Sequence, residues 1–105
     1  AIQLIIAEIA GLYESSRWLC YRLGFLANNP KSYRDFAREA ALSKAVVARN
    51  AQEAARISLD VHGSYGLMQD SEIARVYRDV AMGPQVEGVL HMQQIILAGD
   101  MLKKR

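Results

Sequence analysis

Apolar side chains recur at spacings of three and four residues through most of the chain, which is the period of one face of an α-helix. The first run covers residues 1–27 as a single helix. Glu8, Glu14, Ser15 and Arg22 fall largely outside the apolar stripe. The stripe itself consists of Ile2, Ile5, Ile6, Ile9, Leu12, Tyr13, Leu19, Leu23 and Leu26.

A second helix is predicted from about Pro30 to His62. Asn29 is placed to cap it, and Pro30 suits its first position because a missing N–H costs nothing there. Gly63 is placed to end it in the left-handed conformation. Its apolar face consists mostly of alanine, which lets neighbouring helices approach closely. These alanines are Ala37, Ala40, Ala41, Ala45, Ala48, Ala51, Ala54 and Ala55.

Two further helices follow. Asp70 or Ser71 can cap a third helix that runs to Met82, where Gly83-Pro84 stops it. A last helix is predicted from about Val86 to Lys104. The absence of strand-like alternation, internal repeats and linkers predicts one all-α domain over residues 1–105. We expect an antiparallel up-and-down helical bundle that forms part of a four-helix bundle.

Composition narrows the class of protein. The chain has 105 residues, 51% hydrophobic and 23% charged, which is ordinary for a globular domain. Its net charge is +2 with acids and bases interleaved, so no nucleic-acid footprint is expected. A single cysteine, Cys20, excludes an internal disulfide and favours an intracellular location, cytoplasmic or, in a eukaryote, mitochondrial. No apolar run predicts a membrane span. The chain opens without methionine inside an apolar run, which indicates a fragment.

Several kinds of site lack the residues they need. A di-iron bundle requires Glu-x-x-His pairs on facing helices, and none is present. Zinc sites with cysteine ligands are excluded by the single cysteine, and no glycine loop with Lys and Ser/Thr indicates an NTPase. We therefore predict no metal site.

Three ordered segments resemble one enzyme family. Residues 60–66, Asp-Val-His-Gly-Ser-Tyr-Gly, resemble the Q-x-x-G-G-x-G turn of acyl-CoA dehydrogenases. Residues 75–79, Arg-Val-Tyr-Arg-Asp, resemble their R-x-x-R-D helix, and Glu87-Gly88 resembles the start of their E-G-T signature. The resemblance covers nearly the whole chain and implies the C-terminal helical domain of such an enzyme. It also implies that two preceding domains and the first helix of this bundle lie outside the chain, which predicts an uncovered apolar face and a homo-oligomer.

The resemblance implies a redox reaction on an acyl-CoA. In this family a carboxylate removes the α-proton while hydride passes from the β-carbon to FAD, and Glu87 matches the position of that base. The backbone N–H of Glu87 would help to polarise the thioester carbonyl, and Gly88 would let the backbone pass close to substrate and flavin. From its expected place at a helix N-terminus alone, Glu87 is better interpreted as a solvated acid near a helix dipole, and it is the resemblance that favours the base.

The glycine turn, by the same resemblance, receives the FAD of a neighbouring subunit, with Gly63, Ser64 and Gly66 as cofactor-binding residues. Four flavin-facing positions depart from the family pattern. Asp60 replaces a glutamine and would repel a pyrophosphate, Ser64 replaces a glycine, Val89 replaces a threonine, and His91 stands where a glutamine is expected.

These departures leave alternatives open. The parent protein is either a divergent FAD-dependent acyl-CoA dehydrogenase or a flavin-poor subunit of a heteromeric dehydrogenase. A competing reading is a non-catalytic helical oligomerisation module. Electrons would leave to an acceptor such as an electron-transfer flavoprotein, or to oxygen. Arg75 and Arg78 are interpreted as structural residues that pair with nearby carboxylates.

Overall fold

The computed structural model describes residues 1–29, 31 and 33–103, without the side chains of residues 33–35. It contains four α-helices: α1 (Ile2–Ala27), α2 (Tyr33–His62), α3 (Glu72–Ala81) and α4 (Leu90–Lys103). A short 3-10 helix, η2 (Gly63–Leu67), follows α2 directly. No strand occurs among these residues, so the all-α prediction is confirmed. None of the described helices is long and apolar enough to cross a membrane.

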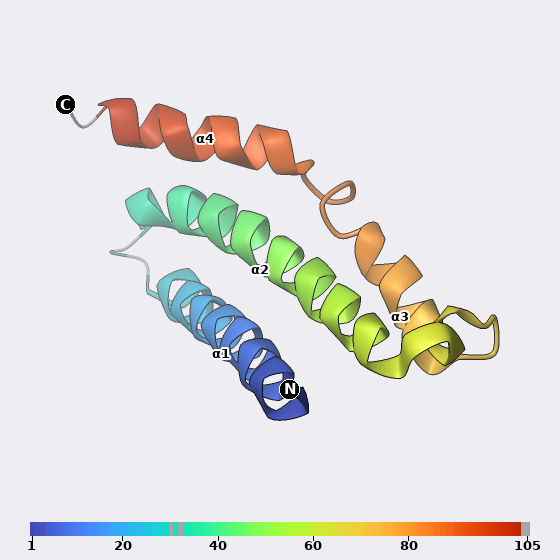
Figure 1. Cartoon of the computed structure of the whole chain (residues 1–105). Coiled ribbons are helices and arrows are strands. Elements are labelled where there is room, and N and C mark those ends of the chain that lie inside the picture. The colour runs from blue at the N-terminus through green and yellow to red at the C-terminus, as the bar shows by residue number, and fades with distance from the viewer. Residues whose placement is uncertain (30, 32, 104–105) are drawn as a thin grey trace.

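Helix α2 is the centre of the arrangement (Figure 1). α1 lies antiparallel along one side of it, and α3 and α4 follow one another along another side. Within the described part of the chain, α1 contacts neither α3 nor α4. The described helices therefore form at most three layers, and α2 is the helix that contacts all the others.

Two apolar stripes run along α1, each repeating at alternate spacings of three and four residues as in a heptad seam. The inner seam is half-buried at every position and faces α2. It consists of Ile5, Ile9, Leu12, Ser16, Leu19, Leu23 and Leu26. The sequence predicted most of this stripe correctly, but Ile2, Ile6 and Tyr13, which it included, are exposed.

The outer seam of α1 is offset from the inner one and is exposed except at Glu14. Its members are Leu4, Ala7, Gly11, Glu14, Trp18, Tyr21 and Phe25. The rings of Trp18 and Tyr21 meet edge to face with centroids 5.8 Å apart, and Arg17 lies over the Tyr21 ring. Trp18 is therefore not part of a core in this chain.

Small side chains make up the buried core. Ala41, Ala45, Ala55, Ile57 and Ala74 are buried, and no large side chain is fully buried. This confirms the alanine-lined face for the central part of α2, although Ala37 is exposed. A buried methyl group contributes about 0.8 kcal/mol, against about 1.5–3 kcal/mol for a buried leucine or phenylalanine. The described helices thus obtain little stability from their core.

Polar contacts supplement this thin core. The Asn50 side-chain amide on α2 donates toward the Leu12 carbonyl (3.3 Å), Ser15 Oγ (3.0 Å) and Ser16 Oγ (3.1 Å) on α1. At the other end of α1, the Arg22 guanidinium bonds both oxygens of the buried Glu39 carboxylate. These side chains fix the register between the two helices.

Most helix ends lie where the sequence predicted them. Gly63 ends α2 with φ +59°, as expected of a left-handed cap. Asn29 Oδ1 accepts from the Lys31 N–H at 3.2 Å, although the α-helix begins only at Tyr33, and Pro30 lies outside the described residues with Lys104 and Arg105. Ser71 precedes α3, but its side chain makes no capping hydrogen bond.

Candidate functional site

The loop between α3 and α4 carries the candidate base. It is closed by backbone hydrogen bonds, with the N–H groups of Gln85 and Val86 donating to the Met82 carbonyl at 2.9 and 3.1 Å. The Leu90 N–H, the first of α4, donates back to the Pro84 carbonyl at 2.8 Å. Pro84 is buried. The loop is therefore a closed turn with defined ends.

Glu87 and Gly88 are consecutive residues with positive φ, +53° and +103°. Among the described non-glycine residues, only Glu87 has a positive φ. A residue with a side chain in this region costs about 1–3 kcal/mol and persists only where its surroundings hold it. Residues with such strain are concentrated at functional sites, so the backbone conformation indicates a functional role for Glu87 independently of the sequence resemblance.

The prediction that the last helix begins near Val86 is wrong, because it begins at Leu90. The cause is the pair of left-handed residues, since positive φ is incompatible with a right-handed helix. Glu87 therefore precedes α4 by three residues. The expected placement of Glu87 at the helix N-terminus does not hold, and this weakens the reading of Glu87 as an acid placed there by the helix dipole.

Glu87 is exposed, as is His91 in the first turn of α4, while Gly88 is half-buried. A carboxylate that acts as a base near neutral pH needs partial removal from water. Within this chain nothing described covers Glu87. The desolvation would have to come from substrate, cofactor or other parts of the protein.

The glycine turn lies at the far end of α2, in η2. Ser64 and Tyr65 are exposed, and a Cβ on Gly63 would meet no atom within 4 Å, so this surface is open. Gly66 differs, because it is buried and a Cβ there would lie 3.0 Å from His62 Cβ and 3.2 Å from the Leu59 carbonyl oxygen. The glycine at 66 is explained by its packing on the end of α2.

Asp60, one turn before this glycine turn, has a partner that the sequence analysis missed. Arg56 Nη1 bonds Asp60 Oδ2 at 2.9 Å, while Arg56 Nε and Nη2 bond the Glu53 carboxylate at 3.0 and 2.8 Å. These contacts raise the pKa of Arg56 above its ordinary value, chiefly through the hydrogen bond with Glu53. The negative charge of Asp60 is thus paired, which reduces the repulsion expected for a pyrophosphate. The i, i+4 spacing of Arg56 and Asp60 was the available signal.

The remaining candidate side chains have structural contacts. Arg75 bonds Glu72 and, at 2.7 Å, Asp79, as expected for a structural pair. Arg78 has no ion pair within the described residues, so its expected pairing is not found. His62 Nδ1 donates to the Ser58 carbonyl at 2.7 Å and so satisfies the last turn of α2.

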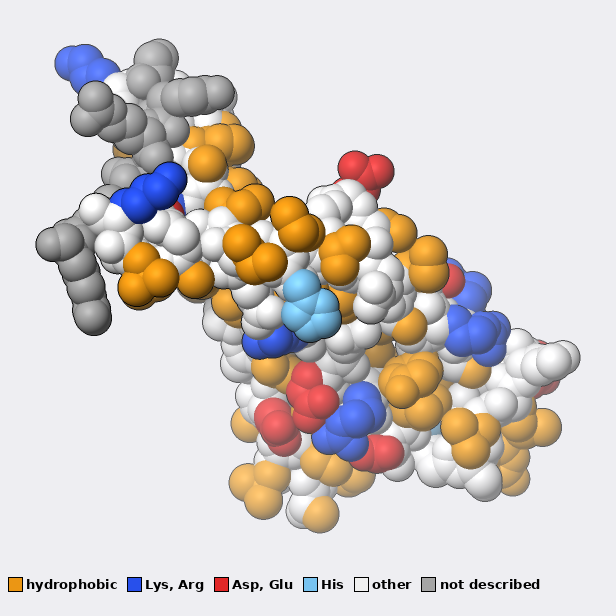
Figure 2. All heavy atoms as spheres, turned by 90° about the horizontal axis from the view of Figure 1, so that it is seen from above, with side chains coloured by type: hydrophobic (Ala, Val, Ile, Leu, Met, Phe, Trp, Pro, Cys, Tyr) orange, Lys and Arg blue, Asp and Glu red, His pale blue; other side chains and the backbone are white. Residues whose placement is uncertain are grey.

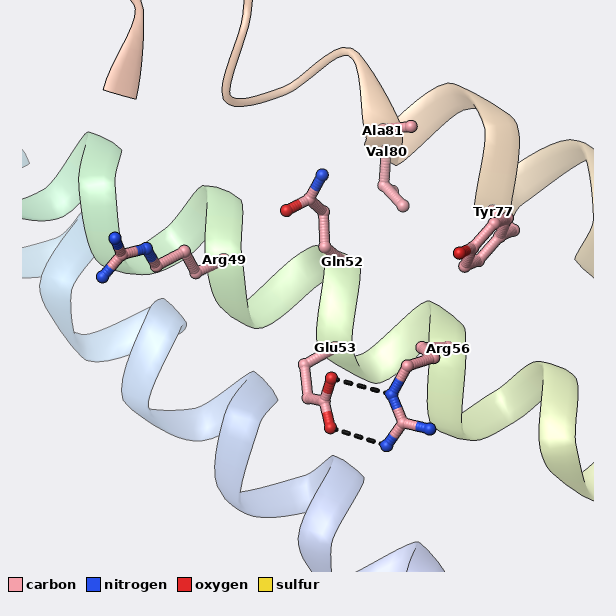
Figure 3. Close-up of a pocket in the computed structure, with 7 residues that line it drawn as sticks. All are labelled: Arg49, Gln52, Glu53, Arg56, Tyr77, Val80 and Ala81. Atoms are coloured by element: carbon pink, nitrogen blue, oxygen red, sulfur yellow. Dashed lines mark hydrogen bonds and ion pairs between the residues drawn. The ribbon is translucent and has the colours of Figure 1, made fainter. Parts of the chain in front are cut away.

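A cleft of about 450 Å³ lies between α2 and α3 (Figure 3). Tyr77 and Val80 point into it from α3, and the Glu53–Arg56 pair lies along α2. None of the predicted site residues lines this cleft. Another, mostly apolar groove of about 340 Å³ runs along residues 40–51 of α2. It is lined by Cys20, Leu23, Ala40, Ser43, Lys44, Val47, Ala48, Ala51 and Gly83.

The two groups of predicted site residues lie apart in this chain. Gly63, Ser64 and Gly66 are at one end of α3, and Glu87, Gly88 and His91 follow its other end (Figure 1). A ten-residue helix spans about 15 Å. One chain therefore presents two separate surfaces. Among the described residues, no group of three or more His, Cys, Asp or Glu side chains could hold a metal ion.

The fold and these motifs define an all-α bundle domain with an E-G turn before its last helix. Residues 1–102 match the family model of the acyl-CoA dehydrogenase C-terminal domain. The chain therefore belongs to the acyl-CoA dehydrogenase family, as part of its C-terminal domain.

The names of similar proteins include both a reductase subunit and dehydrogenases. The chain is 30% identical to the caffeyl-CoA reductase-Etf complex subunit CarC of Acetobacterium woodii, over 99% of the chain and 27% of that protein. It is 31% identical to the mitochondrial short-chain specific acyl-CoA dehydrogenase of Bos taurus, over 98% and 24%. It is also 31% identical to the cyclohexane-1-carbonyl-CoA dehydrogenase of Geobacter metallireducens, over 98% and 26%. The chain spans about a quarter of the length of these relatives.

Proposed function

We propose that this chain is the C-terminal part of an FAD-dependent acyl-CoA dehydrogenase, and that Glu87 is its catalytic base. The observation that carries the proposal is the left-handed pair Glu87-Gly88 in a closed turn of a chain that matches this domain. A scaffold that only joins subunits has no need of a strained glutamate ahead of a helix. The competing oligomerisation module does not account for this feature.

In the proposed reaction, the Glu87 carboxylate takes the α-proton of the acyl-CoA and becomes a carboxylic acid. Bound FAD would accept the hydride from the β-carbon, so that a double bond forms between the α- and β-carbons. The Glu87 backbone N–H would donate to the thioester oxygen, where charge develops during proton removal. Closing the site over Glu87 would remove its carboxylate from water, and a base in a closed site is more effective than one that is fully hydrated.

The residues of the glycine turn fit a dinucleotide at the level of shape and charge. Gly63 and Ser64 form an open surface of small residues, and the Asp60 carboxylate is paired with Arg56 rather than free. Small residues permit close approach of phosphate oxygens. The glycine turn is separated from Glu87 by about the length of α3. The turn would therefore bind the flavin of a second subunit, whereas Gly88 and His91 would lie near the flavin that serves Glu87.

The direction of electron flow is a finer question. The names of the relatives include both dehydrogenases and reductases, and one describes a complex with Etf. In the reductive direction the same Glu87, protonated, would give its proton to the α-carbon. We propose oxidation, with an acceptor such as an electron-transfer flavoprotein.

The exposed apolar faces support the proposal that more protein packs on this chain. Hydrophobic side chains gather over α4 in the view of Figure 2, and the outer seam of α1 and the groove on α2 are also uncovered. The small residues Ala40, Ser43 and Ala51 along that groove suit the close approach of a further helix. We propose that a preceding helix of the same domain and a second subunit cover these faces.

An anaerobic titration of the full-length protein with acyl-CoA thioesters, followed by the visible flavin spectrum, tests the proposal. Bleaching by one thioester is expected, and Glu87→Gln should abolish the bleaching while flavin content stays unchanged. A protein that stays colourless after FAD is added would favour the flavin-poor subunit. A Glu87→Gln variant that is reduced as fast as wild type would remove Glu87 from the mechanism.

A further inference from the structure

The side chain of Gln93, in the first turn of α4, lies directly against Gly88. A Cβ built on Gly88 would be 2.2 Å from Gln93 Nε2 and 3.3 Å from Gln93 Cδ. The three heavy atoms nearest to that position all belong to Gln93. Side chains on a helix lean toward its N-terminus, so Gln93 reaches back over the preceding loop. One side chain therefore bounds the open side of Gly88.

This contact is packing rather than hydrogen bonding. Within the described part of the chain, the Gln93 side-chain amide takes part in no hydrogen bond, although Gln93 is half-buried. The backbone hydrogen bonds of the loop hold its two ends, at Met82 and at Leu90, but not the backbone of Gly88. A glycine at φ +103° has wide conformational freedom unless a neighbour restricts it.

We propose that Gln93 is a positioning residue for Glu87. Its side chain occupies the space into which Gly88 would relax, and so it keeps Glu87 in the left-handed conformation that the rest of the loop does not enforce. The inference rests on the proposed function for the role of Glu87, but the packing relationship itself belongs to this chain. The sequence analysis did not single out Gln93, because a lone glutamine in a helix gives no signal.

Substitutions at 93 separate packing from hydrogen bonding. In the full-length enzyme, Gln93→Ala should lower kcat by a factor on the order of ten to a hundred with KM changed less than about twofold, since a small displacement of a reacting group has this effect. Gln93→Met fills a similar volume without an amide, so it should restore kcat to within about threefold of wild type. Gln94→Ala, the matched control at the adjacent glutamine, should behave as wild type.

Amide hydrogen exchange gives a readout that does not depend on turnover. In the flavin-free full-length protein, the peptide over residues 83–92 should exchange about tenfold faster in Gln93→Ala than in wild type or Gln93→Met. The Leu90 N–H, which bonds the Pro84 carbonyl, is the amide to follow.

The outcomes distinguish the two proposals. If Glu87→Gln is inactive while Gln93→Ala keeps wild-type kcat and exchange, the positioning role is wrong and the proposed function stands. If Gln93→Met is as impaired as Gln93→Ala, the amide group rather than its volume matters, and the packing inference is overturned. If Glu87→Gln turns over normally, the proposed function fails, and faster exchange in Gln93→Ala would still support the packing relationship.

Discussion

Arg22 on α1 forms two hydrogen bonds with Glu39 on α2, from Nε to Oε2 and from Nη2 to Oε1, both at 3.1 Å. Glu39 is only 5% exposed, whereas the Arg22 side chain is 62% exposed. Arg38 also bonds Glu39, at 3.3 Å, and lies 3.6 Å from Asp100 on α4. The buried Glu39 carboxylate thus connects α1 with the Arg38–Asp100 ion pair, which reaches α4.

Removing Arg22 should destabilise the domain. Arg22→Ala leaves Glu39 buried with Arg38 as its described partner, so the free energy of unfolding should fall by about 1–3 kcal/mol. Urea denaturation of the full-length protein measures this. Arg49→Ala is the matched control, because Arg49 is an exposed α2 arginine without an ion pair in the described residues, and its effect should stay within about 0.5 kcal/mol. Equal losses in both variants would contradict the special role of the Arg22–Glu39 pair.

Asn50→Ala should loosen α1 from α2. The substitution removes the donor that reaches Leu12, Ser15 and Ser16, with an expected loss of about 1–2 kcal/mol in the free energy of unfolding. Asn50→Asp, similar in shape but without the N–H donors, should lose at least as much. Thermal denaturation of both variants checks this, and an unchanged midpoint in Asn50→Asp would show that the contact contributes little.

Asp60→Gln should strengthen FAD binding. The variant replaces a carboxylate by a neutral donor beside the glycine turn and releases Arg56 from one of its two partners. We expect the dissociation constant of FAD to fall about three- to tenfold, as one added polar contact to an anion would give. Glu53→Gln serves as the control. Glu53 is the other carboxylate partner of Arg56, and it lies seven residues before Asp60, so this variant also removes one negative charge from Arg56. Fluorescence titration of the flavin-free protein with FAD measures both, and equal effects would assign the gain to Arg56 alone.

The Glu72–Arg75 pair predicts a limited acid sensitivity in α3. The hydrogen bond from Arg75, followed by its charge, holds the pKa of Glu72 below its ordinary value. A lowered pKa contributes stability above the unfolded pKa of about 4.3 and loses it as pH falls through the folded value. The Tm of Glu72→Gln should therefore lie slightly below that of wild type at pH 7, and the difference should shrink as pH falls below the unfolded pKa and through the lower folded pKa. Because the pair is exposed, high salt should shrink the difference at pH 7, and an increase with salt would contradict this.

Substituting the outer seam of α1 should change assembly rather than folding. Replacing Trp18 and Phe25, 61% and 68% exposed, by serine removes large apolar side chains that do not face α2. Secondary structure and urea midpoint should stay near wild type, while the proposed oligomer should dissociate at lower dilution in analytical ultracentrifugation. A double substitution of Leu12 and Leu19 on the inner seam should instead unfold α1. An unchanged oligomer in the outer-seam variant would show that this face is covered from within one subunit.

Local pattern was sufficient for most of the fold. The helical spacing of apolar residues predicted the helices, and Gly63 predicted the end of α2. Both signals depend only on residues that are neighbours in the sequence. The start of α4 was mispredicted since the apolar pattern continues through Val86 and Val89, while two left-handed residues interrupt the backbone. The predicted stripe of α1 included three exposed residues, Ile2, Ile6 and Tyr13, because apolar residues on the exposed side of α1 recur with the same helical period and only packing separates them from the inner seam.

The candidate site was predicted in part. Glu87 was chosen by resemblance, and the structure adds a backbone reason that periodicity could not supply. Arg56 as the partner of Asp60 was visible in the i, i+4 spacing but was not used. Gln93 was invisible, because its contact with Gly88 depends on a helix start that the sequence placed too early.

The central position of α2 has a consequence for how the domain opens. Since α1 contacts neither α3 nor α4 in the described chain, breaking the α1–α2 seam leaves the α2–α3–α4 contacts intact. Release of α1 would break its seam with α2 and the Arg22–Glu39 pair without breaking the backbone hydrogen bonds of the Glu87 loop. A ligand that orders this loop would then protect α4 from exchange more strongly than α1, and the Glu39 carboxylate, shared by Arg22 and Arg38, would be the described contact that links the α1 surface to α4.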